Sequence, residues 1–188
     1  MTFGESIKTC FRKYAVFKGR AMRSEFWWFV LLLLLIEIGL SFVTGLLMIP
    51  LLIKGQFNAE SIMSVQLPLS IVMIVVELVF LLPSLGVLTR RLHDRNKSGW
   101  WIFVYYLLTA LCMVPMFLLF TVADHSEQFN DTITFALVFV MSIMSILLLA
   151  LGITILVWCC QRGTIGPNKY GPDPLEKAYV DVTPQPEV

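Results

Sequence analysis

Four long apolar segments, separated by short polar stretches, dominate the hydropathy pattern of the chain. They cover residues 26–53, 67–88, 100–123 and 133–160, and their only charged residues are Glu37 and Glu77. A helix needs about 20 apolar residues to cross the roughly 30 Å of hydrocarbon in a bilayer, and each segment reaches that length. Lipid offers the backbone no hydrogen-bond partner, so each segment is predicted to be a transmembrane helix. We therefore expect an all-α integral membrane protein with four transmembrane helices in a bundle.

The polar stretches divide the chain into three regions. Residues 1–25 form a basic segment, residues 26–160 the four-span membrane domain, and residues 161–188 a turn and tail rich in glycine and proline. Over the whole chain, 57% of the residues are hydrophobic and only 14% are charged, whereas soluble domains are about 25% charged. A water-soluble core of this size could not bury that much apolar surface, which again indicates a membrane protein.

Positively charged residues are distributed unevenly between these regions. Only Lys54 lies in the loops after the first and third spans. The other 13 of the 14 Lys and Arg residues lie before the first span, between the second and third, or after the fourth. Cytoplasmic segments of membrane proteins carry such an excess of Lys and Arg. The pattern predicts that both termini are cytoplasmic and that the protein is a multi-pass protein of the inner (plasma) membrane.

Three polar patterns on the predicted cytoplasmic side carry most of the remaining information. The first leads into the first span and reads Phe17-Lys-Gly-Arg20-Ala-Met-Arg23-Ser-Glu25-Phe-Trp-Trp28. The second joins the second span to the third and reads Arg90-Arg-Leu-His93-Asp94-Arg-Asn-Lys-Ser98-Gly-Trp-Trp101. The third follows the fourth span and reads Gly163-Thr-Ile-Gly-Pro-Asn168-Lys-Tyr170-Gly-Pro-Asp173-Pro174. The density of Asn, Gly and Pro in the third pattern predicts a defined turn.

Together, and in this order, the three patterns resemble a bacterial inner-membrane family catalogued as domain of unknown function 805. That family is recognised by a Gly-Arg stretch before Ser-Glu-Phe-Trp, by Arg-Arg-Leu-His-Asp before Ser-Gly-Trp-Trp, and by a closing Gly-Pro-Asn-x-Tyr-Gly-x-Asp-Pro. The resemblance extends from about Phe17 to Pro174. One departure is Asn96, which stands where the family often has Gly. The resemblance implies a small multispan protein of the bacterial inner membrane and implies no activity.

The basic residues of these patterns allow several functions. Clusters of Lys and Arg beneath a membrane attract anionic headgroups by about 1 kcal/mol per residue, and several arginines can bind one phosphate through paired hydrogen bonds. The same charges could instead only orient the protein, or dock a protein partner or a second copy. The predicted binding face consists of Arg20, Arg23, Glu25, Arg90, Arg91, His93, Asp94, Asn168, Tyr170 and Asp173.

The two acids within the basic patterns have two interpretations. Glu25 and Asp94 could pair with neighbouring arginines and fasten the segments together, or Asp94 could form an acid–base pair with His93, whose charge changes near neutral pH. No nucleophile elbow, phosphate-binding loop or zinc motif accompanies them. We therefore expect a non-enzymatic protein without cofactor or metal, with membrane lipid as its main partner and no nucleic acid.

Glu37 and Glu77 support an alternative function. Each lies about 15 Å deep at 1.5 Å per helical residue, near the middle of its span. A carboxyl group there is expected to be protonated, to share a proton, or to face water, and ionisable groups in membranes are candidate functional residues. The alternative is a small proton-coupled carrier or ion pathway that uses both acids. A structural interpretation is that each acid hydrogen bonds to a nearby hydroxyl, such as that of Thr44 or Ser84.

Overall fold

The computed structural model describes residues 1–55, 58–125 and 131–176. Within them the chain forms five helices: α1 Phe3–Arg12, α2 Arg23–Ile53, α3 Ala59–Asp94, α4 Trp100–His125 and α5 Asp131–Cys160. Four of these, α2 to α5, contain stretches long and apolar enough to cross a membrane. The predicted all-α membrane fold is thereby confirmed. The last part of the predicted tail, residues 177–188, lies outside the described residues.

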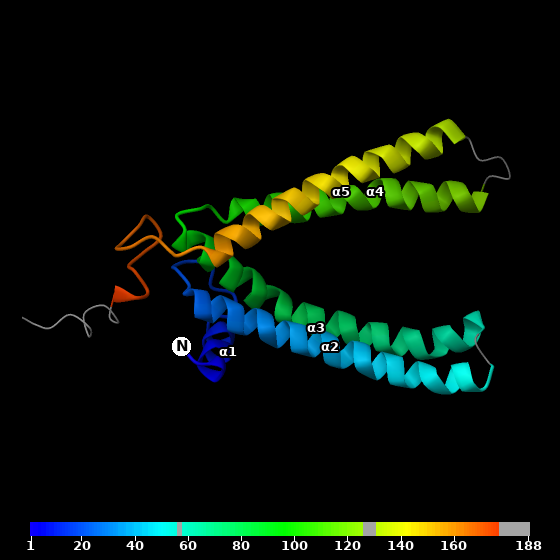
Figure 1. Cartoon of the computed structure of the whole chain (residues 1–188), viewed down its shortest axis with the longest axis horizontal. Coiled ribbons are helices and arrows are strands. Elements are labelled where there is room, and N and C mark those ends of the chain that lie inside the picture. Colours follow the sequence, from blue (N-terminus) through cyan, green and yellow to red (C-terminus); the bar gives the residue numbers. More distant parts are fainter. Residues whose placement is uncertain (56–57, 126–130, 177–188) are drawn as a thin grey trace, which may run out of the picture.

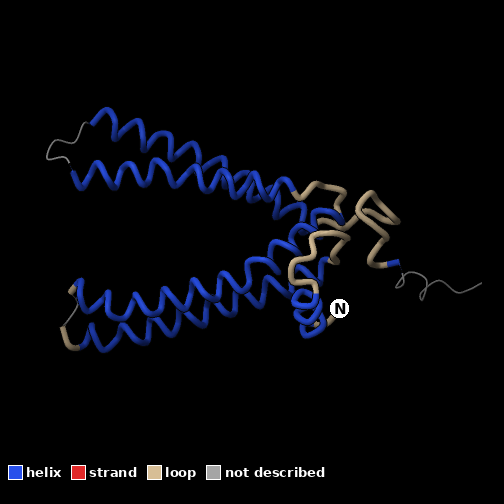
Figure 2. The backbone as a smooth tube through the Cα atoms, turned by 180° about the vertical axis from the view of Figure 1, so that it is seen from behind, coloured by secondary structure: helices blue, strands red, loops and turns tan. Residues whose placement is uncertain are grey.

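The membrane helices form two antiparallel hairpins, which are α2–α3 and α4–α5 (Figure 1). The hairpins converge at the end that carries α1 and residues 161–176, and they diverge toward the other end (Figure 2). We call these the closed end and the open end. Each membrane helix makes most of its contacts with its hairpin partner. The two hairpins pack against each other only at the closed end, so the predicted bundle is closely packed only there.

The helix boundaries extend the predicted spans and add one element. Helix α3 continues beyond the predicted span 67–88 in both directions and carries its regular backbone as far as Asp94. Helix α1 lies within the basic N-terminal segment, where no helix was expected. It begins with a capping box in which Thr2 Oγ1 accepts from Glu5 N and the Glu5 carboxylate accepts from Thr2 N. Such reciprocal bonds satisfy two donors that a helix start leaves free.

Helix α1 lies across the closed end and packs against α2 and α3 (Figure 1). Ser6 and Cys10, four residues apart and therefore on one face of the helix, are both fully buried. Phe11 contacts the rings of Phe29 in α2 and Phe80 in α3, with ring centroids 6.3 and 5.5 Å apart. The short helix thus joins the two helices of the first hairpin.

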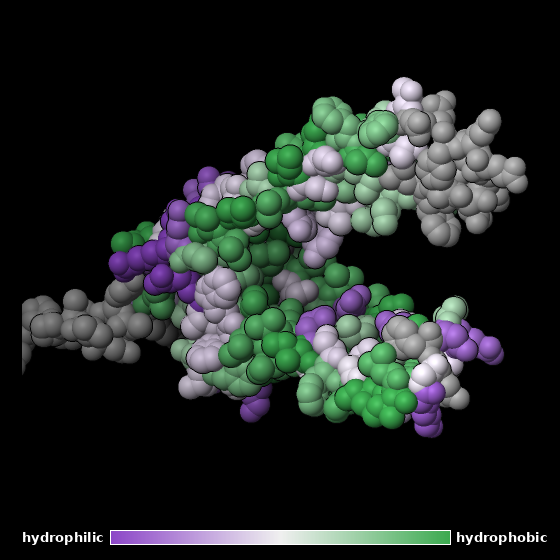
Figure 3. Space-filling view, turned by 45° about the vertical axis from the view of Figure 1, so that its right-hand side comes forward, coloured by the Kyte–Doolittle hydropathy of each residue, from purple (hydrophilic) through white to green (hydrophobic). Residues whose placement is uncertain are grey.

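The buried apolar core also lies at the closed end. It includes Phe29 of α2, Leu92 of α3, Ile102 of α4 and Cys159 of α5, so all four membrane helices contribute. Beyond this core both hairpins expose mainly apolar side chains, and hydrophilic side chains gather at the closed end and at the open end of the α2–α3 hairpin (Figure 3). This distribution is the one expected for helices that face lipid along most of their length.

Candidate functional site

Three arginines and two acids from the sequence patterns are buried together at the closed end. The exposed fraction is 7% for Arg20 and 1% for Arg90 and Arg91, and it is 3% for Glu25 and 4% for Asp94. We call these five residues the buried arginine cluster. Buried charges are costly unless they are paired and hydrogen bonded. The contacts of each guanidinium therefore define what the cluster does.

Arg90 connects α3 to α2 and to the chain between α1 and α2. Its Nη2 lies 2.9 Å from Oε1 of Glu25, and its Nη1 donates to the carbonyl of Val16 at 2.7 Å. Ser6 of α1 donates to the main-chain carbonyl of Glu25 at 2.6 Å. The ion pair thus fixes α1, α2 and α3 relative to one another.

Arg91, the next residue, crosses from α3 to the second hairpin. Its Nε donates to the carbonyl of Cys159 at 3.0 Å, its Nη2 donates to the carbonyl of Gln161, and its Nη1 pairs with Asp94. The last carbonyls of a helix lack donors and form the negative end of its dipole, so a cation there is favourable. Burial lowers the pKa of Arg91, and the charge of Asp94 opposes that effect. The side chain caps α5 and joins it to α3.

Arg20 adds the chain that follows α5. Its Nε donates to Oδ1 of Asp94 at 2.9 Å, and its terminal nitrogens donate to the carbonyls of Gly166 and Thr164. Asp173 lies at 3.9 Å from the same guanidinium. Asp94 therefore pairs with two arginines, one before α2 and one in α3.

The chain after α5 in turn completes the end of α3. The backbone N–H of Thr164 donates to the carbonyl of Asp94 at 2.9 Å, and the side-chain amide of Asn168 donates to the carbonyl of His93, also at 2.9 Å. These carbonyls lie at the C-terminus of α3, where the helix itself runs out of donors, and the carbonyl of His93 also accepts from the backbone N–H of Asn96 at 2.9 Å. Groups connected to each of α3 and α5 thus bind the last carbonyls of the other helix.

Gly163 makes this approach of the two segments possible. A Cβ atom at this position would lie 2.0 Å from Oδ2 of Asp94, inside the van der Waals contact distance. The carboxylate has little freedom to move, because Arg20 and Arg91 both hold it. Only glycine fits between α5 and the buried arginine cluster.

His93 and Asp94 have separate partners. The His93 ring stacks on Tyr170 with a centroid distance of 3.8 Å and an interplanar angle of 5°, and its Nδ1 lies 3.2 Å from the carbonyl of Gly19. Burial lowers the pKa of His93. The geometry therefore supports the ion-pair interpretation of Asp94 and gives no contact for an acid–base pair with His93.

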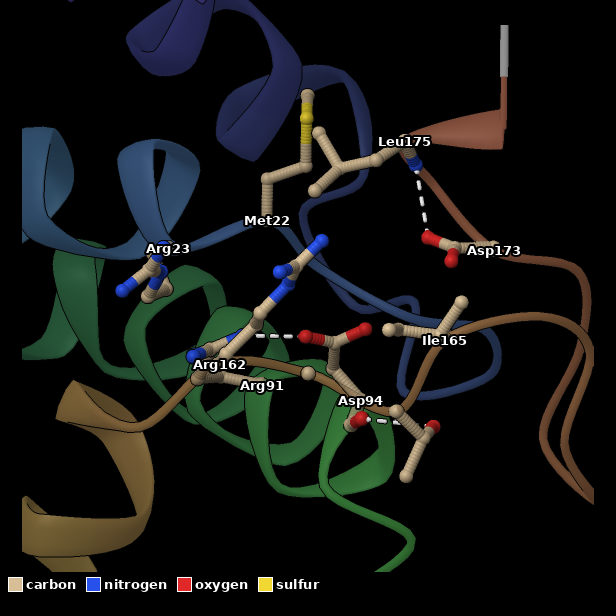
Figure 4. A pocket seen from close by; sticks show the side chains of 10 residues that line it. Met22, Arg23, Arg91, Asp94, Arg162, Ile165, Asp173 and Leu175 are labelled. Atoms are coloured by element: carbon tan, nitrogen blue, oxygen red, sulfur yellow. Dashed lines mark hydrogen bonds and ion pairs between the residues drawn. The ribbon is translucent and has the colours of Figure 1, made fainter. Parts of the chain in front are cut away.

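A small cavity adjoins the cluster (Figure 4). Its volume is about 30 Å³, and Arg91, Asp94 and Asp173 are among the residues that line it. Asp173 uses its carboxylate to accept from the backbone N–H groups of Gly166 and Leu175 at 3.0 and 2.9 Å. Typical ligand sites occupy about 300–1,000 Å³, so this cavity has room for water and not for an organic substrate.

The structure brings nine of the ten residues of the predicted binding face into one network. The tenth, Arg23, is exposed beside it. Sequence reasoning missed the contributions of Ser6, Gly163 and Thr164. Ser6 lies in α1, and the sequence does contain a signal for this helix, because its apolar residues recur with the spacing of a helix face. The main-chain carbonyls that bind Arg20, Arg90 and Arg91 have no such signal.

Glu37 and Glu77 lie away from the cluster, exposed on α2 and α3 at membrane depth. Within the described residues neither carboxyl group makes a hydrogen bond or ion pair. The hydroxyls of Thr44 and Ser84, named above as possible partners, donate instead to carbonyls of their own helices. The carrier that these acids would serve stays a prediction.

The described charges at the closed end leave a positive excess on the surface. The buried arginine cluster and Asp173 together contain three cations and three anions. The remaining side chains of residues 1–25, 89–99 and 161–176 contribute nine cations and two acids. Six of these cations are exposed: Lys8, Arg12, Lys18, Arg23, Arg162 and Lys169. The exposed surface is thus far more basic than the buried part.

Comparison with known proteins connects this architecture to the bacterial inner membrane. Residues 14–172 match a family described as protein of unknown function (DUF805). Inner membrane protein YhaH of Escherichia coli strain K12 is 28% identical over 163 residues, which cover 87% of this chain and 90% of that protein. The protein of the same name from Escherichia coli O157:H7 has the same identity and coverage. No solved structure matches the chain.

Proposed function

The chain belongs to the family described as protein of unknown function (DUF805), and we propose that it is a non-enzymatic inner-membrane protein that binds anionic lipid. In this proposal the exposed basic surface of the closed end makes the headgroup contacts. The closed end faces the cytoplasm, in agreement with the rule that cytoplasmic segments carry the Lys and Arg excess.

The observation that carries the proposal is the separation of buried from exposed charge. Arg20, Arg90 and Arg91 are neutralised by acids inside the protein. Outside the cluster and Asp173, the described part of the closed end contains nine cations and two acids, and six of the cations are exposed. Each Lys or Arg near an anionic membrane surface contributes about 1 kcal/mol of attraction, so the exposed set has enough charge to select anionic headgroups.

This proposal moves the headgroup contacts away from three residues of the predicted face. The donors of Arg20, Arg90 and Arg91 are directed to carboxylates and main-chain carbonyls. We assign these arginines to holding the two hairpins together, and we assign lipid attraction to side chains such as Lys8, Arg12 and Lys18. A rigid closed end would keep those side chains at the membrane surface.

The experiment compares lipid retention by native mass spectrometry after purification from its own membrane. The test variant carries Lys8→Gln, Arg12→Gln and Lys18→Gln, and the matched control carries Lys54→Gln, which removes a cation from the open end. We expect the wild type and the control to retain phosphatidylglycerol in preference to phosphatidylethanolamine, and the triple variant to lose that preference. Equal retention of both lipids by the wild type would contradict the proposal.

A further inference from the structure

An open groove separates α3 from α4 at the closed end, on the inner sides of the two hairpins. Two adjoining cavities of about 490 and 410 Å³ form it, and both are lined by Phe17, Thr89, Gly99 and Phe103. A smaller cavity of about 190 Å³ continues inward and shares Ile102 and Tyr106 with the second. The space-filling view shows a hollow between the two hairpins (Figure 3). We call this feature the α3–α4 groove.

The lining of the groove changes along its length. Thr89, His93 and Ser98 line the part nearest the ends of the helices. Leu81, Leu85 and Tyr106 line the part farther along them. The groove therefore has one polar end and one apolar end, which is the pattern of a lipid molecule.

The length of the groove also fits a lipid. Leu81 and His93 are 12 residues apart in α3, which corresponds to about 18 Å along the helix. One leaflet of a bilayer contributes about 15 Å, half of the hydrocarbon thickness of roughly 30 Å. An acyl chain lying along α3 would cover the apolar part and place its headgroup near His93.

Positive charge lies close to the polar end of the groove. Lys18 follows Phe17, which lines the groove, in the chain. Nζ of Lys169 lies 4.9 Å from the centroid of Tyr170, the ring that stacks on His93. No acidic residue lines either of the two larger cavities. The polar end is thus complementary to a phosphate group.

A hydrogen-bond donor is also available there. Ser98 Oγ accepts from the backbone N–H of Trp100 at 3.3 Å, so its own hydroxyl proton is free to donate to a ligand. Trp100 itself is 69% exposed beside the groove, and tryptophan favours the headgroup level of a membrane.

We propose that the α3–α4 groove binds one phospholipid with an anionic headgroup, its acyl chain along Leu81 and Leu85 and its phosphate beside His93 and Ser98. The proposal rests on the proposed lipid-binding function and gives it a defined site with one lipid per chain. Because α3 of one hairpin and α4 of the other line the groove, the ligand would enter sideways from the leaflet.

The test replaces Leu85 with Trp, which fills the groove, and uses Leu78→Trp as the matched control. Leu78 lies on the same helix, is 61% exposed and lines neither of the larger cavities. Native mass spectrometry in the presence of phosphatidylglycerol should show one retained lipid per chain for the wild type and for Leu78→Trp. We expect Leu85→Trp to reduce that occupancy at least tenfold.

A second measurement on the wild type does not depend on how the variants fold. Phosphatidylglycerol with a photoreactive acyl chain should crosslink mainly to residues 81–106 that line the groove, as mapped by peptide mass spectrometry. Crosslinks spread evenly over the outer faces of α2 and α5, or a Leu85→Trp variant with undiminished lipid, would overturn the groove assignment. A wild-type dimer that Leu85→Trp dissociates would overturn it too, with a second copy as the occupant.

These outcomes separate the two proposals. If the wild type prefers phosphatidylglycerol and Leu85→Trp leaves lipid occupancy unchanged, the groove is not the binding site and the basic surface alone binds lipid. If the wild type shows no headgroup preference, both the proposed function and the proposed site for an anionic lipid are rejected.

Discussion

The hydroxyl of Tyr14 donates a hydrogen bond of 2.6 Å to the main-chain carbonyl of Val79 in α3. Val79 lies four residues before Pro83, which is inside the same helix. Because proline has no N–H, the carbonyl of Val79 lacks its usual donor within α3. Tyr14 supplies that donor from the chain that follows α1. The N-terminal segment is therefore bonded to the membrane helix at the point where proline leaves a carbonyl free.

The first prediction follows from this bond. Tyr14→Phe removes the hydroxyl and leaves the carbonyl of Val79 unpaired, which should lower the free energy of unfolding by about 1–3 kcal/mol. Pro83→Ala provides the control, because alanine at that position would supply the missing N–H. We expect Tyr14→Phe to cost much less in the Pro83→Ala background. Thermal unfolding followed by fluorescence-detected size exclusion would measure the loss of stability caused by Tyr14→Phe in each background. Equal losses in the wild-type and Pro83→Ala backgrounds would show that the hydroxyl does not replace the missing donor.

The second prediction concerns the buried pair of Arg90 and Glu25. Glu25→Gln leaves the Arg90 charge without its anion, and losing one partner of a buried pair costs about 3–5 kcal/mol. Arg23→Gln, two residues away and exposed, should change the free energy of unfolding by less than about 0.5 kcal/mol. Unfolding midpoints in detergent would measure both. Similar midpoints for the two variants would mean that the pair contributes little to stability.

The third prediction concerns the close contact of Gly163 with Asp94. Gly163→Ala places a methyl group where the carboxylate of Asp94 lies, so the ion pairs of Asp94 with Arg20 and Arg91 must shift. We expect the free energy of unfolding to fall by about 3 kcal/mol, the upper end of the range for overpacking. Gly45→Ala in α2 is the control, because nothing lies within 4 Å of its Cβ position. We expect the control to unfold at or above the wild-type temperature, since Ala favours helix over Gly. A Gly163→Ala protein as stable as the control would contradict the contact.

The membrane helices could be predicted from the sequence, but their packing could not. Long apolar runs report contact with lipid, and each predicted span lies inside an observed helix. Residues that face lipid and residues that face another helix are both apolar, so hydropathy does not show that two hairpins diverge toward the open end. Helix α1 was missed because its charged residues made the N-terminal segment look only basic.

The residues of the site could be predicted, but their environment could not. The pairing of Glu25 with an arginine was one of two open interpretations, and the structure gives the partner as Arg90. The burial of Arg90 and Arg91 depends on main-chain carbonyls far away in the sequence, which no side-chain pattern reveals. Asn96, a departure from the family pattern, has a positive φ of 57°, a conformation that Asn tolerates better than most residues.

The fourth prediction concerns pH. Burial is the largest cause that lowers the pKa of His93 below its ordinary value of 6.5, and the nearby charge of Lys169 acts in the same direction. The unfolded chain therefore takes up a proton at a higher pH than the folded protein does. Stability should be complete above about pH 6.5 and should fall as the pH drops below it, because protonation then favours the unfolded state.

His93→Phe tests this directly, because phenylalanine keeps a flat ring to stack on Tyr170 and cannot take up a proton. Carboxyl groups also titrate in acid, so the informative quantity is the difference between variant and wild type at each pH. Unfolding midpoints measured from about pH 7.5 to 5.5 should fall less steeply for His93→Phe than for the wild type. Parallel curves for His93→Phe and the wild type would mean that the histidine takes up its proton equally in both states, and the stacked ring would then contribute packing alone.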